Sequence, residues 1–393
     1  MTRARDVANV LSTATSLATD TETAAAISSH NSATTSVHGI SNTATLATQT
    51  YADSAVSTHA AAADPHAVYL KESEFVAAGK NLVINGGMDF WQRGTSFASS
   101  NSTYLFTTDR WEIVRHGFHL GMTVSRQTAG LDGFRYCARI QRDSGNTSTN
   151  NLQFQTSFET SEVLPFINKT MTISFYARKS STASSSSLNA QIIAGTGTDQ
   201  AIKNYTGGTV SFQQTFTLTD SWQRFSFSGS VLSPYTEFGI WFGYTPSGTA
   251  GAADYVELTG VQIEQGSVAT SFSRAAGNIQ GELAACQRYY QRFTGGSSNT
   301  YIASGGQAGS SVDLYVPVKL TTTMRISPTA IDYSALRWQI ISNSGTISNA
   351  VISDANPNMC LVRCTSTGLT STTQPYMLMT ATGADYLGFS AEL

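Results

Sequence analysis

The strongest constraint on the fold is an alternation of apolar and polar residues through the middle of the chain. Apolar side chains occupy every second position from Met171 to Ala177 and again from Phe238 to Tyr244. Period two is the repeat of a β-strand that buries one face. Between residues 256 and 263 the apolar parity switches across Gly260, where a one-residue bulge would restore the buried face. Strands do not alternate with helices, so we expect an antiparallel jelly-roll β-sandwich over residues 80–275.

Residues 1–79 have a different composition, rich in Ala, Ser and Thr and without Trp. Such side chains cannot build a globular core within one chain. Small or apolar residues nevertheless recur at steps of three and four, the spacing of a coiled-coil seam. The seam residues are Val7, Val10, Ala14, Leu17, Thr21, Ala24 and Ser28. We therefore expect an α-helical or extended stalk that is ordered by partner copies of the chain.

Two stretches of this segment echo each other, and each contains a pair of histidines: His30 with His38, and His59 with His66. In a symmetric bundle, like histidines would meet on the axis and could bind a metal or an anion. The alternative, which we favour, is hydrogen bonding between chains, because neither pair has the close spacing of a chelating motif.

Residues 276–393 predict a third, β-rich unit. Alternation in 312–318 and 336–340 indicates strands, whereas 288–293 fits a helix or a strand equally well. The last residues, 387–393, also alternate, which is typical of a strand held in a sheet. We expect a C-terminal β-sandwich tip, so the chain as a whole is predicted to be mainly β.

Charge and cysteine content exclude several classes of function. The chain has 393 residues, 12% of them charged, and a net charge of −3. It thus lacks the basic surface expected of a nucleic-acid-binding protein. No apolar run is long enough for a membrane-spanning helix, and no signal peptide is visible at the start. The four cysteines are scattered, so we expect buried free thiols; Cys360 and Cys364 alone cannot complete a zinc site.

Several motifs resemble a protein family. Residues 80–97 contain Asn85-Gly86 and Trp91-Gln92-Arg93-Gly94, and Thr108-Asp109-Arg110-Trp111 follows. Together they resemble the opening of a carbohydrate-binding-like domain found in bacteriophage tail fibres and minor tail proteins. The stretches 269–272 and 282–290, the latter with Cys286-Gln287-Arg288-Tyr289-Tyr290, are similar to the junction that closes this domain. Val37-His38-Gly39-Ile40 and Asp64-Pro65-His66 are similar to stalk repeats of phage fibres.

The resemblance implies a homotrimeric tail fibre or minor tail protein, assembled in the host cytoplasm and located in the virion tail. Its N-terminus would attach to tail-tip or baseplate proteins, and its distal end would bind a host surface receptor, expected to be a glycan. Abundant Ser, Thr and Asn at low charge suit hydrogen bonding to sugar hydroxyls. The domains expected are a stalk (1–79), a carbohydrate-binding-like jelly roll (80–275) and a receptor-binding tip (276–393).

No recurring catalytic signature is present, so we expect a protein that is not an enzyme. A glycosidase needs two nearby carboxylates, and the candidate pairs are Glu159 with Glu162, Glu257 with Glu264, and Asp332 with Asp354. The alternative is a tail-associated glycan depolymerase or esterase whose site lies between subunits. A third class is a cellular adhesin or a non-catalytic module of a secreted enzyme.

The candidate receptor-binding residues are four aromatic residues and one amide of the tip, since rings stack on sugars and amides bind hydroxyls. They are Tyr301, Tyr333, Trp338, Tyr376 and Asn343. Each could equally pack in the core, and the same two readings apply to Trp91, Trp111, Trp222 and Trp241.

We expect no cofactor. Calcium could be held in the central sandwich by loop oxygens such as those of Asp132 and Asp143. His116 and His119 have no third ligand near them in the sequence.

Overall fold

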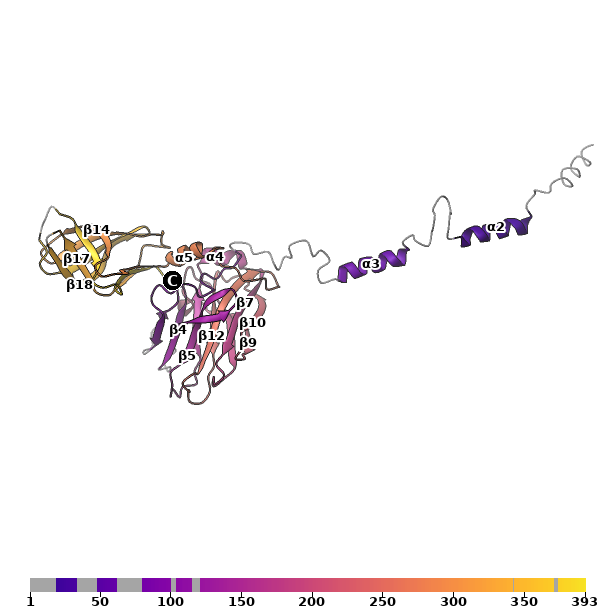
Figure 1. Ribbon diagram of the computed structural model, residues 1–393, viewed down its shortest axis with the longest axis horizontal. Coiled ribbons are helices and arrows are strands. Elements are labelled where there is room, and N and C mark those ends of the chain that lie inside the picture. Colours follow the sequence, from indigo (N-terminus) through magenta and orange to yellow (C-terminus); the bar gives the residue numbers. More distant parts are fainter. Residues whose placement is uncertain are drawn as a thin grey trace, which may run out of the picture. The chain divides into compact units, whose positions relative to one another are not determined.

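A computed structural model describes residues 19–33, 48–61, 80–99, 104–114, 121–341, 343–370 and 374–393. The chain divides into two units, residues 1–71 and 72–393 (Figure 1). Part of the predicted seam (Val7 to Leu17) and the histidines His38, His66, His116 and His119 lie outside the described residues.

In the described part of the N-terminal unit there are two helices, α2 (Asp20–Ser32) and α3 (Gln49–Ala61). Helix α2 starts at a capping box: the Thr19 side chain accepts from the Glu22 amide, and the Glu22 carboxylate accepts from the Thr19 amide. These hydrogen bonds lower the pKa of Glu22. Every side chain of α2 is exposed, so helical structure is present at Thr21, Ala24 and Ser28, while the trimeric stalk stays a prediction. Among the described helices, none combines the length and apolar character needed to cross a membrane.

The central domain is a sandwich of two six-stranded antiparallel sheets. The first sheet has the order β1 (Ser96–Ser99), β4 (Met122–Leu131), β5 (Phe134–Arg142), β12 (Tyr255–Gln265), β7 (Thr170–Lys179), β10 (Gln223–Ser230). The second has the order β2 (Leu105–Phe106), β3 (Glu112–Val114), β6 (Leu152–Ser157), β11 (Glu237–Tyr244), β8 (Ser187–Gly195), β9 (Thr209–Thr217). This arrangement confirms the expected antiparallel sandwich.

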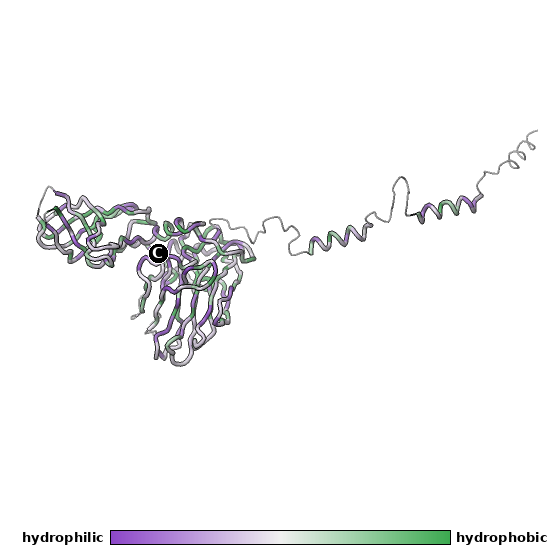
Figure 2. The backbone as a smooth tube through the Cα atoms, in the orientation of Figure 1, coloured by the Kyte–Doolittle hydropathy of each residue, from purple (hydrophilic) through white to green (hydrophobic). Residues whose placement is uncertain are grey.

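The alternation in the sequence predicts the core of this sandwich correctly. Apolar and polar residues alternate along the strands (Figure 2), and the predicted inward residues of β7 and β11 are buried. The Trp111 and Phe154 rings stack between the sheets with centroids 4.7 Å apart. The shared parity of Val210, Phe212, Phe216 and Leu218 predicts that all four point inward, and for Val210 this is wrong. The pairing of β8 with β9 skips Ser211, which leaves Val210 43% exposed.

The predicted bulge in β12 is confirmed. The pairing of β12 with β7 shifts register between Thr259 and Gln262. Gly260 lies at this point with φ +63°, a conformation that favours glycine. Because of the extra residue, Leu258 and Val261 both point into the core.

Short helical segments lie at the end of the sandwich that joins the tip: α4 (Thr160–Val163), η3 (Leu164–Phe166) and α5 (Ile279–Gln287). Helix α5 is followed at once by strand β13 (Tyr290–Thr294). The ambiguous stretch 288–293 is thus mostly strand, and the helical spacing before it belongs to α5.

The C-terminal domain is a closed barrel with a small sheet beside it. The barrel order is β14 (Tyr301–Ala308), β15 (Asp313–Lys319), β19 (Met359–Ser366), β18 (Asn343–Asn356), β17 (Leu336–Ile340), β20 (Tyr376–Thr380). In the sheet, β21 (Tyr386–Ser390) lies between β13 and β16 (Ala330–Tyr333). The predicted strand at the end of the chain is therefore confirmed. The expected sandwich is corrected to a barrel, because pairing of β14 with β20 closes the sheet and removes its free edges.

All four cysteines are free and buried, as expected. Burial raises the pKa of the Cys360 and Cys364 thiols to about 12, so both stay protonated and pack as small apolar groups.

Candidate functional site

A row of side chains crosses the outer face of the second sheet. Five residues from five neighbouring strands are register partners in turn: Glu112, Gln155, Trp241, Gln191 and Gln213. Side chains in register point to the same face of a sheet. Since Ile240 and Phe242, the neighbours of Trp241 on β11, are buried in the core, the row faces outward.

Two glycines of β11 make room for bulky groups on this face. A Cβ on Gly243 would collide with the Trp241 ring, so the ring lies over the backbone of Gly243. A Cβ on Gly239 would collide with Ile202 of the short helix η4 (Ile202–Asn204). The sequence Gly-Ile-Trp-Phe-Gly thus allows an aromatic ring and a helical wall to lie close to the sheet.

The wall itself is held by a buried carboxylate. Glu237 accepts hydrogen bonds from the amides of Gly197 (3.0 Å) and Gln200 (2.9 Å), which shapes the chain between β8 and η4. The Ile202 amide donates to Ser157 Oγ at 2.9 Å. Wall and sheet are therefore joined by direct hydrogen bonds, and the space between them is set by the fold.

This space is a groove of about 440 Å³. It is lined by Tyr104, Gln153, Gln155, Gln191, Ile193, Ile202, Lys203, Tyr205, Gly208 and Trp241. Lys203 is its charged lining residue, and Glu112 neutralises it at 3.0 Å. The Lys203 ammonium also lies 4.4 Å from the centroid of the Tyr104 ring. The groove is thus neutral and combines rings with amides.

Amide hydrogen bonds hold the row in place. Gln155 Nε2 donates to Glu112 Oε1 at 2.8 Å, and Gln191 Nε2 donates to Gln213 Oε1 at 2.7 Å. An amide carries two donor hydrogens and an acceptor with two lone pairs, so the face keeps donors and acceptors for a ligand.

The tyrosines of the groove are neutral at physiological pH. Burial raises the pKa of Tyr205, and the nearby Glu237 carboxylate raises it further. Burial and the Glu112 carboxylate also raise the pKa of Tyr104. Both hydroxyls keep their protons and can act as hydrogen-bond donors.

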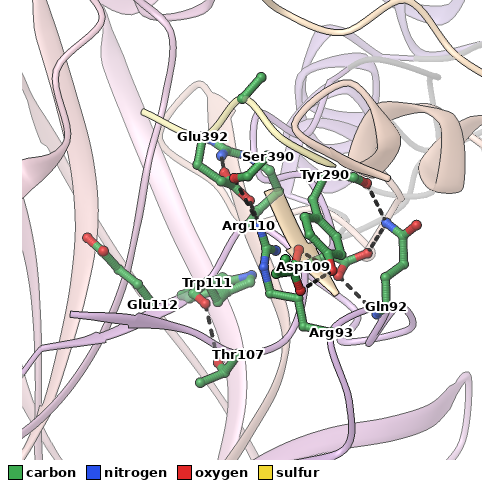
Figure 3. A network of polar contacts seen from close by, with 12 residues as sticks. Gln92, Arg93, Thr107, Asp109, Arg110, Trp111, Glu112, Tyr290, Ser390 and Glu392 are labelled. Carbon is green, nitrogen blue, oxygen red and sulfur yellow. Dashed lines mark hydrogen bonds and ion pairs between the residues drawn. The ribbon is translucent and has the colours of Figure 1, made fainter. Parts of the chain in front are cut away.

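The motifs that carry the family resemblance lie elsewhere, at the junction between sandwich and tip (Figure 3). Arg110 is buried there, where it pairs with Glu392, donates to the Ser157 carbonyl at 2.6 Å and stacks on Tyr289 at 3.5 Å. Arg93 forms a second ion pair with Glu392 at 3.2 Å. These residues therefore hold two domains together.

Asp109 completes the junction. It accepts from the Gln92 amide at 3.1 Å and from Gln92 Nε2 at 2.7 Å, and Nε2 also donates to the Tyr290 carbonyl. Burial raises the pKa of Asp109 to about 6, although the Arg93 charge and the Gln92 hydrogen bonds lower it. Asp109 thus carries its charge at neutral pH inside the protein.

Of the five receptor-binding residues predicted in the tip, two lie in the barrel core. Trp338 and Tyr376 are each 1% exposed, and their rings meet edge to face at 5.3 Å. Their faces are covered by protein, so they cannot stack on a sugar in this structure. The alternation of Leu336, Trp338 and Ile340 fits this position, which the sequence left as open as ligand binding.

The other three predicted residues lie at or near the surface. Tyr301 is 57% exposed at the start of β14, and Asn343 is exposed at the start of β18. Tyr333 is half-buried on β16, where its hydroxyl donates to Asn349 Oδ1 at 3.2 Å.

The four sandwich tryptophans divide in the same way. Trp91 and Trp111 belong to the core. Trp241 lines the groove of the second sheet, although it is only 7% exposed, and Trp222 lies half-buried beside the first sheet. The sequence did not distinguish these roles. The alternation along β11, together with the glutamines at alternate positions of β6, could have indicated the groove.

Asp132 and Asp143, the residues considered for calcium, do not form a shared site. Asp132 precedes β5 and Asp143 follows it, so the nine-residue strand separates them by about 30 Å and they cannot share an ion. In the described part of the chain, no group of three or more His, Cys, Asp or Glu side chains could hold a metal.

The carboxylate pairs considered for catalysis are engaged in structural contacts. Glu159 accepts from Arg288 Nε (3.0 Å) and Nη2 (2.9 Å). Glu264 accepts from Gln262 Nε2 at 2.7 Å. Asp332 accepts from the Tyr290 hydroxyl at 2.9 Å.

Comparison with known proteins reveals similarity to solved structures. No family model matches the sequence, and no curated protein matches it. A carbohydrate-binding module, CBM4, is 23% identical over 47% of this chain and 100% of its own, with a TM-score of 0.30. The CBM22-1 xylan-binding domain of Xyn10C from Paenibacillus barcinonensis is 15% identical over 49% of this chain and 99% of its own, with a TM-score of 0.29.

A third similar structure is the enzymatically active domain of tailspike protein 4 from bacteriophage CBA120. It is 13% identical over 47% of this chain, with a TM-score of 0.31. The match spans 21% of that chain. At such TM-scores the similarity carries no functional argument, and the arguments below rest on the geometry of this chain.

Proposed function

We propose that this protein binds a glycan in the groove of the second sheet. The observation that carries the proposal is the Trp241 ring, held over Gly243 and flanked in register by Gln155 and Gln191. A sugar ring has apolar C–H faces, which pack on aromatic rings, and hydroxyls at its edges, which pair with amides. Ligand pockets span roughly 300–1,000 Å³, and the groove lies within that range.

We further propose that the chain is a non-catalytic part of a bacteriophage tail, a homotrimeric tail fibre or minor tail protein. The motif resemblance in residues 80–97 and 282–290 supports this proposal, as does the fully exposed face of α2, which could pack against partner copies. The N-terminal segment would attach to tail-tip or baseplate proteins, and the glycan would be a receptor on the host cell. Three weak sites per fibre would suffice, since linked sites raise the effective concentration.

The tip contributes a second contact in this proposal. Tyr301 and Asn343 remain candidates there because their side chains are exposed. The groove is the main site, since its groups are positioned by the fold before any ligand arrives.

The test is binding of the full chain to isolated surface polysaccharides of bacterial hosts. Gln191→Ala with Gln213→Ala should weaken binding about thirtyfold, since each of two hydrogen bonds contributes about 1 kcal/mol. Gln127→Ala, an amide on the other sheet, is the matched control. If Tyr301→Ala abolishes binding while the double variant does not change it, the site is in the tip and the groove proposal is wrong.

The homotrimer is tested separately by light scattering of the purified chain. Three copies of the 41.9 kDa chain give a particle of about 126 kDa. A monomer at working concentrations would contradict the proposal of a trimeric fibre, but it would not bear on glycan binding in the groove.

A further inference from the structure

A second row of outward side chains lies on the first sheet, opposite the groove. Arg139 on β5 and Arg178 on β7 are both register partners of Glu257 on β12. The neighbours of Glu257 on its strand, Val256 and Leu258, are buried in the core, so the three charged side chains share the outer face. We call these three residues the arginine cluster.

Glu257 is fully buried between the two arginines. Its Oε1 accepts from Arg139 Nε at 2.9 Å and Nη2 at 2.7 Å, and its Oε2 accepts from Arg178 Nε at 2.6 Å. Two positive charges thus meet one negative charge, and the cluster has an excess of one positive charge. The arginine side chains are 25% and 30% exposed.

Several guanidinium nitrogens of the cluster are not used by the protein. Within the described part of the chain, no hydrogen bond involves Nη1 of Arg139 or either Nη of Arg178. Because Glu257 already holds both guanidiniums in place, an incoming anion would meet donors that lose little freedom on binding.

Aromatic rings support the cluster. The Arg139 guanidinium lies 3.8 Å from the centroid of the Tyr255 ring, and that of Arg178 lies 4.8 Å from the Trp222 ring. The Trp222 indole is itself fixed, because its Nε1 donates to the Ala129 carbonyl at 2.8 Å. Half-buried rings beside positive donors offer contact for the apolar face of a sugar as well as for its charge.

Further positive charge lies along β5 and on the neighbouring strand β10. Arg135 on β5 and Arg224 on β10 are exposed. Asp132 and Asp220 lie in the turns before these strands rather than on the face. On a chain of net charge −3, this face is therefore a local excess of positive charge.

We propose that the arginine cluster binds the carboxylate groups of an acidic polysaccharide, at a surface separate from the groove. Guanidinium groups bind carboxylates through paired, charge-assisted hydrogen bonds. Tyr255 and Trp222 would contact the sugar ring that bears the carboxylate. The site goes beyond the neutral groove because it would recognise the charge of a glycan and not its hydroxyl pattern.

The experiment compares binding of the full chain to polygalacturonate and to the fully methyl-esterified polymer, which has the same backbone without charge. We expect polygalacturonate alone to bind, with an affinity that falls as salt increases. Arg178→Gln should weaken binding about tenfold, because hydrogen bonds to charged groups are the stronger ones. Arg363→Gln, which removes an exposed arginine from β19 of the barrel, is the matched control.

Four results would overturn the proposal. Equal binding of the methyl ester would exclude charge recognition. If Arg178→Gln and Arg363→Gln lose polygalacturonate binding equally, and thermal melting shows that both variants are folded, binding depends only on the overall charge of the protein. Equal binding of poly-glutamate would exclude recognition of the sugar. If the variant Gln191→Ala with Gln213→Ala still binds polygalacturonate, the two surfaces are separate. If it no longer binds, the acidic polysaccharide binds in the groove.

Discussion

The outer faces of the two sheets in the central sandwich have the same strand geometry, but their polar and charged side chains are paired in different ways. On the second sheet, amides pair with each other across the strands, and Lys203 is neutralised by Glu112. On the first sheet, two arginines share one carboxylate and keep an excess charge. Replacing one amide of the second sheet should change the free energy of unfolding little. The arginine cluster, in contrast, depends on a buried carboxylate. The difference predicts separate responses to mutation.

The largest expected effect comes from removing the buried charge. Glu257→Ala leaves Arg139 and Arg178 facing each other without a counter-charge, which should lower the free energy of unfolding by about 3 kcal/mol. Urea denaturation measures this loss. Gln191→Ala, at the matching place on the other sheet, should change stability by less than about 0.5 kcal/mol. Equal losses in the two variants would show that the faces do not differ in this way.

A smaller effect should come from the glycine under Trp241. Gly243→Ala forces the ring off the sheet, and such overpacking should lower the free energy of unfolding by about 1–2 kcal/mol. Glycan binding in the groove should be lost as well. The control is Gly251→Ala, because a Cβ there meets nothing within 4 Å. Unchanged glycan affinity in a folded Gly243→Ala variant would contradict the role of the ring.

The junction provides a pH-dependent effect and a test that both faces are independent of it. Burial raises the pKa of Asp109 to about 6, against about 3.9 in an unfolded chain. Between these values the folded protein holds a proton that the unfolded chain releases, so this group lowers stability as pH rises from about 4 to about 6. Asp109→Asn has no such proton, and its stability should decline less over that range.

Urea denaturation at several pH values measures the difference between the wild type and Asp109→Asn. Parallel curves would mean that Asp109 titrates as it does in the unfolded chain. At neutral pH, neither glycan binding nor polygalacturonate binding should change in this variant. A change in either would show that the junction acts on that face.

Particular elements show how far the sequence predicts the fold. Parity within single strands predicted the buried faces of β7 and β11, and the bulge at Gly260 was visible as a switch of parity. Parity failed at Val210 because the extra residue opposite β8 left no apolar mark in the sequence. It also could not distinguish a barrel from a sandwich in the tip, since both need strands with one buried face.

The candidate sites were harder to predict. For Trp338 and Tyr376 the sequence left ligand contact and core packing equally open, and the structure places both in the core. The junction motif was recognised by resemblance, yet its contact partners, such as Glu392, lie in another domain. Long-range partners of this kind leave no trace in local periodicity.

The sequence by itself determined where the central strands lie, most of their inward faces, and the buried state of the four cysteines, because these follow from local alternation and apolar content. The tertiary structure alone decided which outward residues become neighbours. Glu112, Gln155, Gln191, Gln213 and Trp241 are far apart in the chain and meet only through strand order and register. The same holds for Arg139, Arg178 and Glu257, because hydrogen bonding between strands sets the register and the backbone groups that make those bonds are the same for nearly every residue.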